Sequence, residues 1–577
     1  MIKEKRNKDI KKNNNRKGFQ KKEEPVIRFA CLGGLEEIGR NMMFFEYENE
    51  IIIIDAGLQF PEEETPGIDY IIPNVSYLAE RKEKIKAIII THGHYDHIGA
   101  IPYIMQKLGN PLIITTAITK EIIARRQEEF PNTPKLNFDI VKAGDSRKIS
   151  KNFKAEFFGV THNIPDGFGT ILNTPVGKIV HAGEFKFDYD IKGNPRGLEI
   201  WEKLGKEKIH TLLIESTGAE DQGNSISERV VEKEIEKLFK KAPGRIILGT
   251  FASLLDRLAE IIKIAERMDK RVAISGSSMK SNIQIARNLG LMKIKKGTLI
   301  SLDEIRKYND DKIVILCTGA QGESNASLMK IATGEHRQIK IKKGDSIILS
   351  SSIVPGNERS VQILKDDLSR QGALVYHYKM MDIHSSGHAP QEELKTVMKM
   401  VKPRFIFPMH GYYFMRWRNA QNAQEALGLK PSETILVDNG QVVLFTKESA
   451  KISDEIIPAY YVMVDGLGVG DVGEVVLRDR RMLAQEGMVV IIATLDRRSG
   501  RFLKNPDIIS RGFIYLRENK EFVEELRKRI KSLVSRNPRH QHIESDYIKS
   551  LMRDQIGQFL YNRTKRRPMV LPVIIEV

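Results

Sequence analysis

The sequence predicts an α/β fold in three parts. A layered α/β domain is interrupted by an inserted α/β domain with a parallel sheet, and a small α+β domain ends the chain. Three observations predict this architecture. Short apolar strands separated by glycine turns alternate with helical stretches early in the chain. From about Ser225 helices and strands alternate regularly, as in parallel sheets. The length of 577 residues suggests about three to four domains.

The first domain is expected to start with short strands. Val26–Ala30 and Ile51–Ile54 are apolar runs of strand length, and Gly33-Gly34, Gly39 and Gly57 punctuate the sequence around them. Their alternation with helical stretches indicates layers of helix and sheet.

The inserted domain shows the clearest periodicity. Ser227–Lys240 reads as an amphipathic helix, Arg245–Gly249 as a strand, Leu254–Met268 as a helix and Arg271–Ile274 as a strand. Such an order is typical of a parallel sheet with crossover helices.

The C-terminal part is expected to be a separate small domain. A cluster of glycines between Asp465 and Gly473 suggests a linker or a cluster of turns. Beyond it, a strand near Met488–Ile492 and helices near Glu521–Arg536 and Ser545–Tyr561 predict the α+β domain. The expected boundaries are a disordered basic arm at 1–24, the first domain at 25–217 and 376–450, the inserted domain at 218–375, the linker at 451–473 and the C-terminal domain at 474–577.

Composition narrows the classes of function. The formal net charge is +17, and the lysine-rich segment before Glu24 has few apolar residues, so we interpret it as a disordered arm. Such charge attracts phosphate backbones without regard to sequence, although a solubilising tail has the same composition. Cys31 and Cys317 lie in apolar runs and are expected to be reduced. No apolar run reaches the roughly 20 residues of a membrane span, so we expect a cytoplasmic protein without a membrane contact.

The most informative motif is Thr91-His92-Gly93-His94-Tyr95-Asp96-His97, which directly follows the apolar run Ala87–Ile90. His92 and His94 project to one side of an extended segment, and Asp96 and His97 follow one turn later. Imidazole and carboxylate are ligands of Zn²⁺ and Mn²⁺ in catalytic sites. The motif therefore predicts two divalent metal ions, with Zn²⁺ favoured and Mn²⁺ or Mg²⁺ as alternatives.

The remaining ligands are expected at other strand ends. His162, Glu184 and His410 each follow an apolar run and precede or accompany a glycine or proline turn. Each alone is equally well read as an ordinary loop residue, but their shared position favours one common site.

The order of these residues resembles the metallo-β-lactamase fold. The inserted domain resembles the β-CASP nucleases, and the sequence is most similar to the bacterial ribonuclease J family from about Val26 to Val577. The similarity rests on further motifs, which are Gly33–Met42, Asp55–Gly57, Thr250–Ser253, Thr318–Glu323, Pro355–Glu358, His384–His388 and Ser510–Phe513. The resemblance implies an αββα sandwich for the first domain.

The resemblance also implies residue roles. It assigns one metal to His92, His94 and His162 and the other to Asp96, His97 and His410, with Glu184 bridging both. It makes Asp96, Glu215 and His388 catalytic, with His388 protonating the leaving oxygen. The remaining implied positions bind the 5′ phosphate of RNA, and these are Ser253, His384, Ser385, Ser386, Gly387 and His388. The stretch around Gly387 also has the plainer interpretation of a turn that positions His388.

Two positions depart from the family pattern. Tyr95 stands where an acid is usual, although that position is not a ligand. Glu184 stands where an aspartate is usual, and its extra methylene requires the backbone to retreat or the bridge to become one-sided. One hypothesis is a site of lower activity, since glutamate here also resembles the weakly active second paralogue that some bacteria carry. The presence of His97 and the other ligands argues against that hypothesis.

The family resemblance implies a ribonuclease that cleaves single-stranded RNA from the 5′ end and internally, in messenger decay and ribosomal RNA maturation. It also implies a homodimer or homotetramer, with a paralogous subunit or other RNA-decay proteins as further partners. Three alternatives stay open: a weakly active RNA-binding partner subunit, a small-molecule hydrolase such as a thioesterase, and a DNA-directed nuclease. The inserted domain and positive charge argue against the small-molecule hydrolase, whereas the choice between RNA and DNA rests on the 2′-hydroxyl and groove shape.

Overall fold

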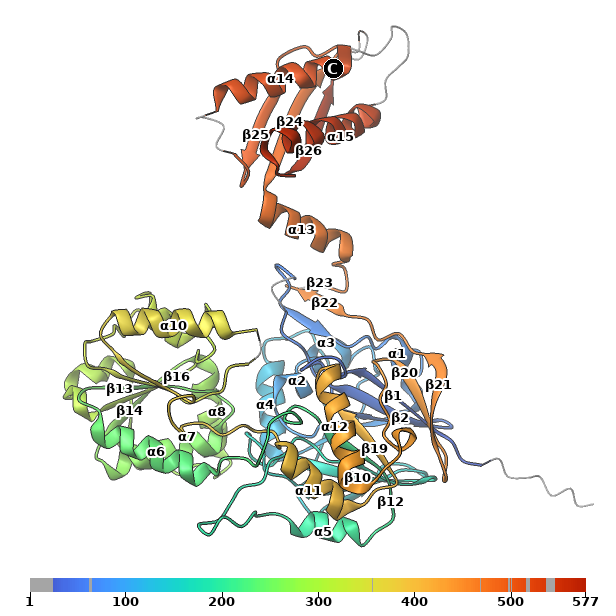
Figure 1. The fold of residues 1–577 in the computed structure, drawn as a ribbon, viewed down its shortest axis with the longest axis vertical. Coiled ribbons are helices and arrows are strands. Elements are labelled where there is room, and N and C mark those ends of the chain that lie inside the picture. Colours follow the sequence, from blue (N-terminus) through green and yellow to red (C-terminus); the bar gives the residue numbers. More distant parts are fainter. Residues whose placement is uncertain are drawn as a thin grey trace, which may run out of the picture.

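The structure is a computed structural model, shown in Figure 1. It describes residues 24–61, 65–354, 356–466, 468–496, 499, 501–514, 519–535 and 545–577. The basic arm expected at 1–24 lies outside the described residues apart from Glu24. Among the described residues, no helix combines the length and the apolar character that a bilayer crossing requires.

The first domain is a sandwich of two sheets. One sheet has the strand order β21 (Ala450–Ile456), β20 (Gln441–Phe445), β1 (Ile27–Gly33), β2 (Met42–Tyr47), β3 (Glu50–Ile54), β5 (Ile85–Ile89), β6 (Ile113–Thr115) and β7 (Phe138–Ile140). The other has the order β19 (Phe405–Met409), β12 (Ile209–Glu215), β11 (Gly177–His181), β10 (Phe168–Thr174), β9 (Lys154–Gly159) and β8 (Ser146–Lys148). Phenylalanines fill the space between the sheets, and the rings of Phe29 and Phe407 meet edge to face at 5.0 Å.

Helices cover both outer faces, so the domain is the expected αββα sandwich. The first sheet is covered by α1 (Ser76–Ala79), α2 (Tyr95–Ile98), α3 (Ile101–Ile104) and α4 (Ala117–Gln127). The second is covered by α5 (Glu199–Gly205), α11 (Gln391–Val401) and α12 (Tyr413–Leu427). Single 3₁₀ turns occur at Lys82–Lys84, Leu302–Lys307, Asp310–Lys312 and Pro431–Glu433.

The inserted domain contains one parallel sheet, as the periodicity predicts. Its strand order is β15 (Leu299–Ile300), β14 (Arg271–Ser275), β16 (Ile313–Cys317), β13 (Ile246–Gly249), β17 (Ser346–Leu349) and β18 (Leu374–His377). The helices are α6 (Glu228–Lys241), α7 (Leu255–Arg267), α8 (Ser277–Asn288), α9 (Ser327–Ala332) and α10 (Glu358–Arg370). The chain leaves the first domain after β12 and returns on β19, and these two strands are parallel neighbours. Cys31 and Cys317 are buried free thiols, as expected.

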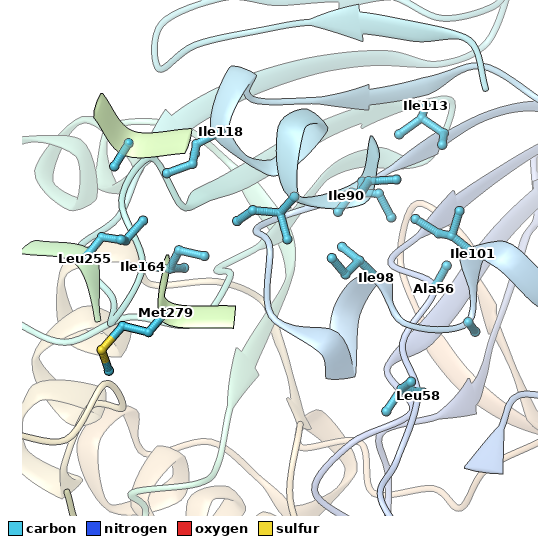
Figure 2. Close-up of a cluster of buried hydrophobic side chains, with 14 of the residues drawn as sticks. Ala56, Leu58, Ile90, Ile98, Ile101, Ile113, Ile118, Ile164, Leu255 and Met279 are labelled. Atoms are coloured by element: carbon cyan, nitrogen blue, oxygen red, sulfur yellow. The ribbon is translucent and has the colours of Figure 1, made fainter. Parts of the chain in front are cut away.

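The inserted domain packs against the first one through apolar side chains. Figure 2 shows Leu255 of α7 and Met279 of α8 beside Ile118 and Ile164 of the first domain. Met279 follows β14, so this contact turns the carboxyl edge of the parallel sheet toward the first domain. Ligands of open parallel sheets bind at that edge.

Segment 451–473, which is expected to be a linker, contains short paired strands. Strand β21 pairs with β20 and extends the large sheet, and β22 (Val462–Asp465) pairs with β4 (Tyr70–Ile72) and β23 (Gly468–Val469). The glycine-rich composition correctly indicates turns, but β21 forms a hairpin with the preceding strand, and β22 finds a partner, β4, that lies almost 400 positions earlier. The boundaries of the domains remain a proposal.

The C-terminal domain is a three-stranded sheet with two helices on one face. Strand β24 (Met488–Leu495) pairs antiparallel with β25 (Asp507–Arg511) and parallel with β26 (Met569–Glu576). Helices α14 (Lys520–Ser535) and α15 (Ser545–Thr564) supply the core against this sheet. The connecting helix α13 (Glu474–Glu486) leads to this domain, which stands apart in Figure 1. The opposite sheet face exposes Ile509, Leu571, Val573 and Ile575.

Candidate active site

Strand ends bring the predicted site residues together. Thr91 to His97 follow β5, and His410 directly follows β19. Glu184 follows β11, which is parallel to β12, and β12 is parallel to β19. Strand β9, which precedes His162, runs in the same direction as β11 because both are antiparallel to β10. All these strands therefore end at the same edge of the sandwich, where their ligands meet.

The first cluster contains His92, His94, His162 and Glu184, whose donor atoms all lie within 4.8 Å of one another. The Nε2 atom of His92 is 3.0 Å from Nδ1 of His94, and Nε2 of His162 is 3.2 Å from the same atom. Oε2 of Glu184 lies 3.1 Å from Nε2 of His162. Ring nitrogens that converge in this way are arranged like ligands around a cation.

The second cluster contains Asp96, His97, Glu184 and His410. Oδ2 of Asp96 is 3.3 Å from Nε2 of His97 and 3.5 Å from Nε2 of His410. Oε1 of Glu184 is 2.7 Å from Nε2 of His97 and 2.6 Å from Nδ1 of His410. The structure thus groups the predicted ligands into the two sets that the resemblance implies.

Glu184 takes part in both clusters. One carboxylate oxygen faces His92 and His162, and the other faces His97 and His410. The positive φ of Gly183, +71°, lies just before it, where the backbone turns away from β11. The longer side chain is therefore accommodated with its two oxygens divided between the clusters, and the one-sided arrangement is not the one seen.

Burial and neighbouring charges set the protonation of the ligands. Burial first, and then His162, lower the pKa of His94 to about 3. Burial and His97 hold the pKa of His92 well below its usual value. Burial raises the pKa of Asp96, but His97 outweighs it and brings the value to about 2. At neutral pH His92 and His94 are thus neutral imidazoles and Asp96 is a carboxylate, which are the forms that bind metal. Burial lowers the pKa of His97, but Glu184 and Asp96 outweigh it and raise the pKa well above its usual value, so binding of a metal there would displace a proton.

A divalent metal pair fits these residues. Both ring nitrogens of His410 are buried and have no hydrogen-bond partner among the described residues, even though Glu184 lies close. Buried polar atoms rarely stay unpaired, and a metal ligand bond would satisfy them. Four donors in each cluster match the ligand number of zinc sites.

Two residues that were not predicted as site residues, Asp55 and Asn41, contact the predicted ligand His97. Asp55 Oδ2 lies 2.7 Å from Nδ1 of His97, and Oδ1 accepts the backbone N–H of Thr91 at 2.8 Å. The amide nitrogen of Asn41 lies 3.2 Å from Nε2 of His97. Asp55 follows β3, the parallel neighbour of β5, so the strand-end rule could have found it. No sequence signal marks Asn41 individually.

Glu215, which is buried, and His388, which is partly exposed, form a pair beside the clusters. Nδ1 of His388 is 2.5 Å from Oε2 of Glu215, and the His388 and His410 rings are 5.6 Å apart. Burial lowers the pKa of His388, but the Glu215 carboxylate raises it more strongly, to about 9. His388 therefore carries a proton at neutral pH.

The predicted phosphate-binding residues lie in one loop, with one exception. His384 to His388 are consecutive, and Gly387 O accepts a hydrogen bond from Nδ1 of His162 at 2.8 Å. A side chain at Gly387 would collide with Asn163 and His162, which explains the glycine. Ser253 lies before α7, and none of its hydrogen bonds to the described residues involves His384 or Ser386.

Buried charges support this loop. Arg257 lies with Nη1 2.7 Å from Nδ1 of His384, and Lys186 donates to Oγ of Ser385 at 2.8 Å. Glu228 pairs with both cations at 2.7 Å. Arg257 lies among the buried positions of α7, and a charge on an apolar helix face is a signal that could have revealed it.

Comparison with known proteins agrees with this geometry. Residues 36–192 match the metallo-beta-lactamase superfamily, and residues 243–368 match the beta-CASP domain of ribonuclease J. Residues 377–430 match the Zn-dependent metallo-hydrolase RNA specificity domain, and residues 475–577 the ribonuclease J C-terminal domain. Ribonuclease J2 of Bacillus subtilis is 36% identical over 97% of this chain and all of its own length. The chain belongs to the ribonuclease J family.

Other members of the family are similarly related. Ribonuclease J 1 of Streptococcus pyogenes is 37% identical over 94% of this chain and 97% of its own. Ribonuclease J 2 of Staphylococcus aureus is 36% identical over 96% of this chain and 99% of its own. Sequence identity alone therefore does not distinguish the relative named ribonuclease J 1 from those named ribonuclease J2 or J 2. A solved protein of unknown function from Enterococcus faecalis shares the fold, with a TM-score of 0.53 and 16% identity over 73% of this chain and all of its own.

Proposed function

We propose that this member of the ribonuclease J family is a metal-dependent ribonuclease that uses two divalent ions. The observation that supports it is the pair of four-residue clusters that share the Glu184 carboxylate. His92, His94 and His162 would hold one ion, and Asp96, His97 and His410 the other, with Zn²⁺ favoured over Mn²⁺ or Mg²⁺ by the imidazole-rich donor set.

The chemistry is hydrolysis of a phosphodiester. The ions would supply an activated water and stabilise the attacking and departing oxygens. His388 is placed to donate its proton to the leaving oxygen, and Glu215 holds the imidazole in orientation and keeps it charged. Asp96 combines its ligand role with a position beside His97 and His410, at the point where the two rings approach.

The loop from His384 to His388 supports a proposed direction of RNA degradation. Ser253, His384, Ser385, Ser386 and Gly387 would bind the 5′ phosphate, close to His388 and the clusters. A terminal phosphate held there favours stepwise 5′→3′ removal of nucleotides, and RNA chains that reach the clusters away from their ends would also be cut internally. We further propose that this activity serves messenger decay and ribosomal RNA maturation in the cytoplasm.

The decisive test is product analysis on single-stranded RNA. The purified chain, with Zn²⁺ or Mn²⁺, is given RNA with a 5′ monophosphate, the same RNA with a 5′ triphosphate, and the corresponding DNA. We expect mononucleotides from the monophosphate RNA, with little from the DNA and none from Asp96→Ala. Intact RNA binding without turnover, with turnover restored by Glu184→Asp, would favour the second candidate, a weakly active RNA-binding partner subunit of a heteromeric complex. Glu184 itself motivates that candidate.

Assembly is proposed to involve the C-terminal domain. Its outer sheet face exposes Leu571, Val573 and Ile575 at 39%, 43% and 49%. Contiguous apolar faces of this kind mark interfaces. We propose a homodimer or homotetramer that buries this face, with a paralogous chain or another RNA-decay protein as an alternative occupant.

A further inference from the structure

A second cavity lies in the inserted domain, away from the metal clusters. It has a volume of about 170 Å³ and is formed where β16, β17 and β18 end and α10 passes over them. Its buried floor is apolar and consists of Ala320, Leu349 and Val361.

The rim of this cavity carries uncompensated positive charge. Lys365 of α10 and Lys379 after β18 both line it, and neither forms an ion pair with any residue that the structure describes. Glu358 is the one acid among the lining residues, and its Oε2 already accepts the backbone N–H of Gly356. Burial lowers the pKa of His377, and the charges of Lys365 and then Lys379 lower it further. An anion would relieve this field.

Neutral donors and an aromatic ring complete the wall. Ser351 offers a hydroxyl, whose oxygen accepts from the Gln321 amide and whose hydrogen can still donate. The amide nitrogen of Gln362 also lines the wall and donates to Asp366. Tyr378 offers a ring face, with the Lys379 ammonium 5.9 Å from its centroid. Ligand sites are typically apolar with a few placed polar groups, and aromatic faces stack on nucleic-acid bases.

The position in the fold also favours a ligand. Strands β16 and β17 flank β13 on its two sides, and the chain crosses from one side to the other between them. Such switch points at the carboxyl ends of parallel strands are where open α/β sheets bind nucleotides. Lys379 precedes His384 by five residues, so the cavity and the proposed phosphate-binding loop share one segment.

We propose that this cavity binds a nucleoside phosphate, with Lys365, Lys379 and His377 on the phosphate and Tyr378 against the base. The ligand is a free mononucleotide or a nucleotide of bound RNA, since both present the same chemistry. The site is separate from the metal clusters and does not require hydrolysis to bind.

The test measures AMP binding by titration calorimetry in the full-length Asp96→Ala protein, where no turnover is expected. Hydrogen exchange of peptides that cover Leu374–Lys379 locates the binding. Lys365→Gln/Lys379→Gln should weaken AMP binding at least tenfold and abolish the protection of β18. The control Lys293→Gln/Lys296→Gln removes the same charge beside the opposite edge strand, β15, and should leave both unchanged.

The ligand source is distinguished by a second titration, with a short 5′-hydroxyl RNA in place of AMP. If AMP protects β18 from exchange and the RNA does not, and if the protection requires the two lysines, the ligand is the free nucleotide. If AMP and the RNA both protect β18, RNA is a ligand as well. Equal binding of adenosine and AMP, or AMP binding that is unchanged in Lys365→Gln/Lys379→Gln, would overturn the proposal. Thermal unfolding of each variant verifies that the substitutions leave the fold intact. Failure of RNA hydrolysis would not affect these results.

Discussion

At the scale of single residues, the site depends on groups that orient the ligands as much as on the ligands themselves. Glu184 reaches both clusters although it is one methylene longer than the usual aspartate. His97 lies between Asp55 on one ring nitrogen and Glu184 on the other, at 2.7 Å each. Such carboxylate contacts fix the tautomer and the ring orientation of a ligand histidine.

Asp55→Asn is expected to lower metal affinity about 10- to 100-fold, because the amide keeps the shape of Asp55 but no longer accepts at both oxygens. Competition with a chromophoric chelator measures the affinity. Asp190→Asn, at an exposed turn of the same domain, serves as the matched control and should bind as tightly as the parent. Equal metal affinities for Asp55→Asn and the parent would show that Asp55 does not orient His97 for metal binding.

The charge of Glu228 is expected to make the stability of the fold depend on pH. Burial raises its pKa, but Arg257 and Lys186 bring it to about 2, below the 4.5 of a free side chain. A depressed pKa contributes stability above about pH 4.5, and this contribution is lost as the pH falls toward 2. Because 34% of the side chain is exposed, we expect Glu228→Gln to cost about 1–2 kcal/mol at pH 7.

Urea unfolding of the parent and Glu228→Gln at several pH values tests this prediction. The difference between their free energies of unfolding should become smaller as the pH falls from 4.5 toward 2. Glu234→Gln, whose exposed pair with Lys237 lies on the same helix, should change stability by no more than about 0.5 kcal/mol. A difference in unfolding free energy that stays constant across the acid range would contradict the lowered pKa of Glu228.

At the scale of elements, helices α7 and α8 join the two large domains. Leu255 and Met279 are buried against Ile118 and Ile164, as Figure 2 shows. The same helix α7 carries Arg257, which contacts His384. Apolar packing and the charge network therefore act on one element, and both hold the carboxyl edge of the parallel sheet near the site.

Met279→Ala should destabilise the inserted domain by about 2–4 kcal/mol, since a fully buried methionine leaves a cavity. It should also loosen the packing against α4, which would appear as faster hydrogen exchange in peptides of both helices. Leu289→Ala, directly after α8 and 37% exposed, should cost less than about 1 kcal/mol. Unchanged exchange in α4 would show that Met279 does not couple the two domains.

At the scale of the whole molecule, the C-terminal domain has one covered and one open sheet face. The alternation along β24 buries Val489, Ile491 and Ala493 beneath α14 and α15. The alternate positions of the neighbouring strands expose Ile509, Leu571 and Val573. A three-stranded sheet with an apolar open face is suited to association.

If the protein assembles through this face as proposed, Val573→Lys is expected to yield a smaller species than the parent, because a charge on an apolar interface carries a desolvation penalty. Sedimentation velocity at several protein concentrations measures the change. Tyr547→Lys, on exposed α15 surface of the same domain, is the control and should assemble normally. Identical sedimentation of Val573→Lys and the parent would exclude this face as the interface.

Much of the fold was predictable because its signals are local. The helices at α6 and α7 and the strands at β13 and β14 lie within one or two residues of their predicted bounds. The predicted metal ligands all follow strands, and parallel strands end at a common edge, so their convergence was predictable as well. The pairing of β22 with β4 was not, because it depends on a partner almost 400 positions away in the chain.

Sequence therefore determined the three-part α/β architecture and the family, and it predicted which residues converge as candidate metal ligands, since periodicity, spacing and motifs are properties of the chain itself. Tertiary structure established how the Glu184 carboxylate is divided between the clusters, and that Asp55, Lys186 and Arg257 support the site. It also revealed the cavity lined by Lys365 and Lys379. These features depend on distances between side chains from separate elements, and folding alone brings such elements together.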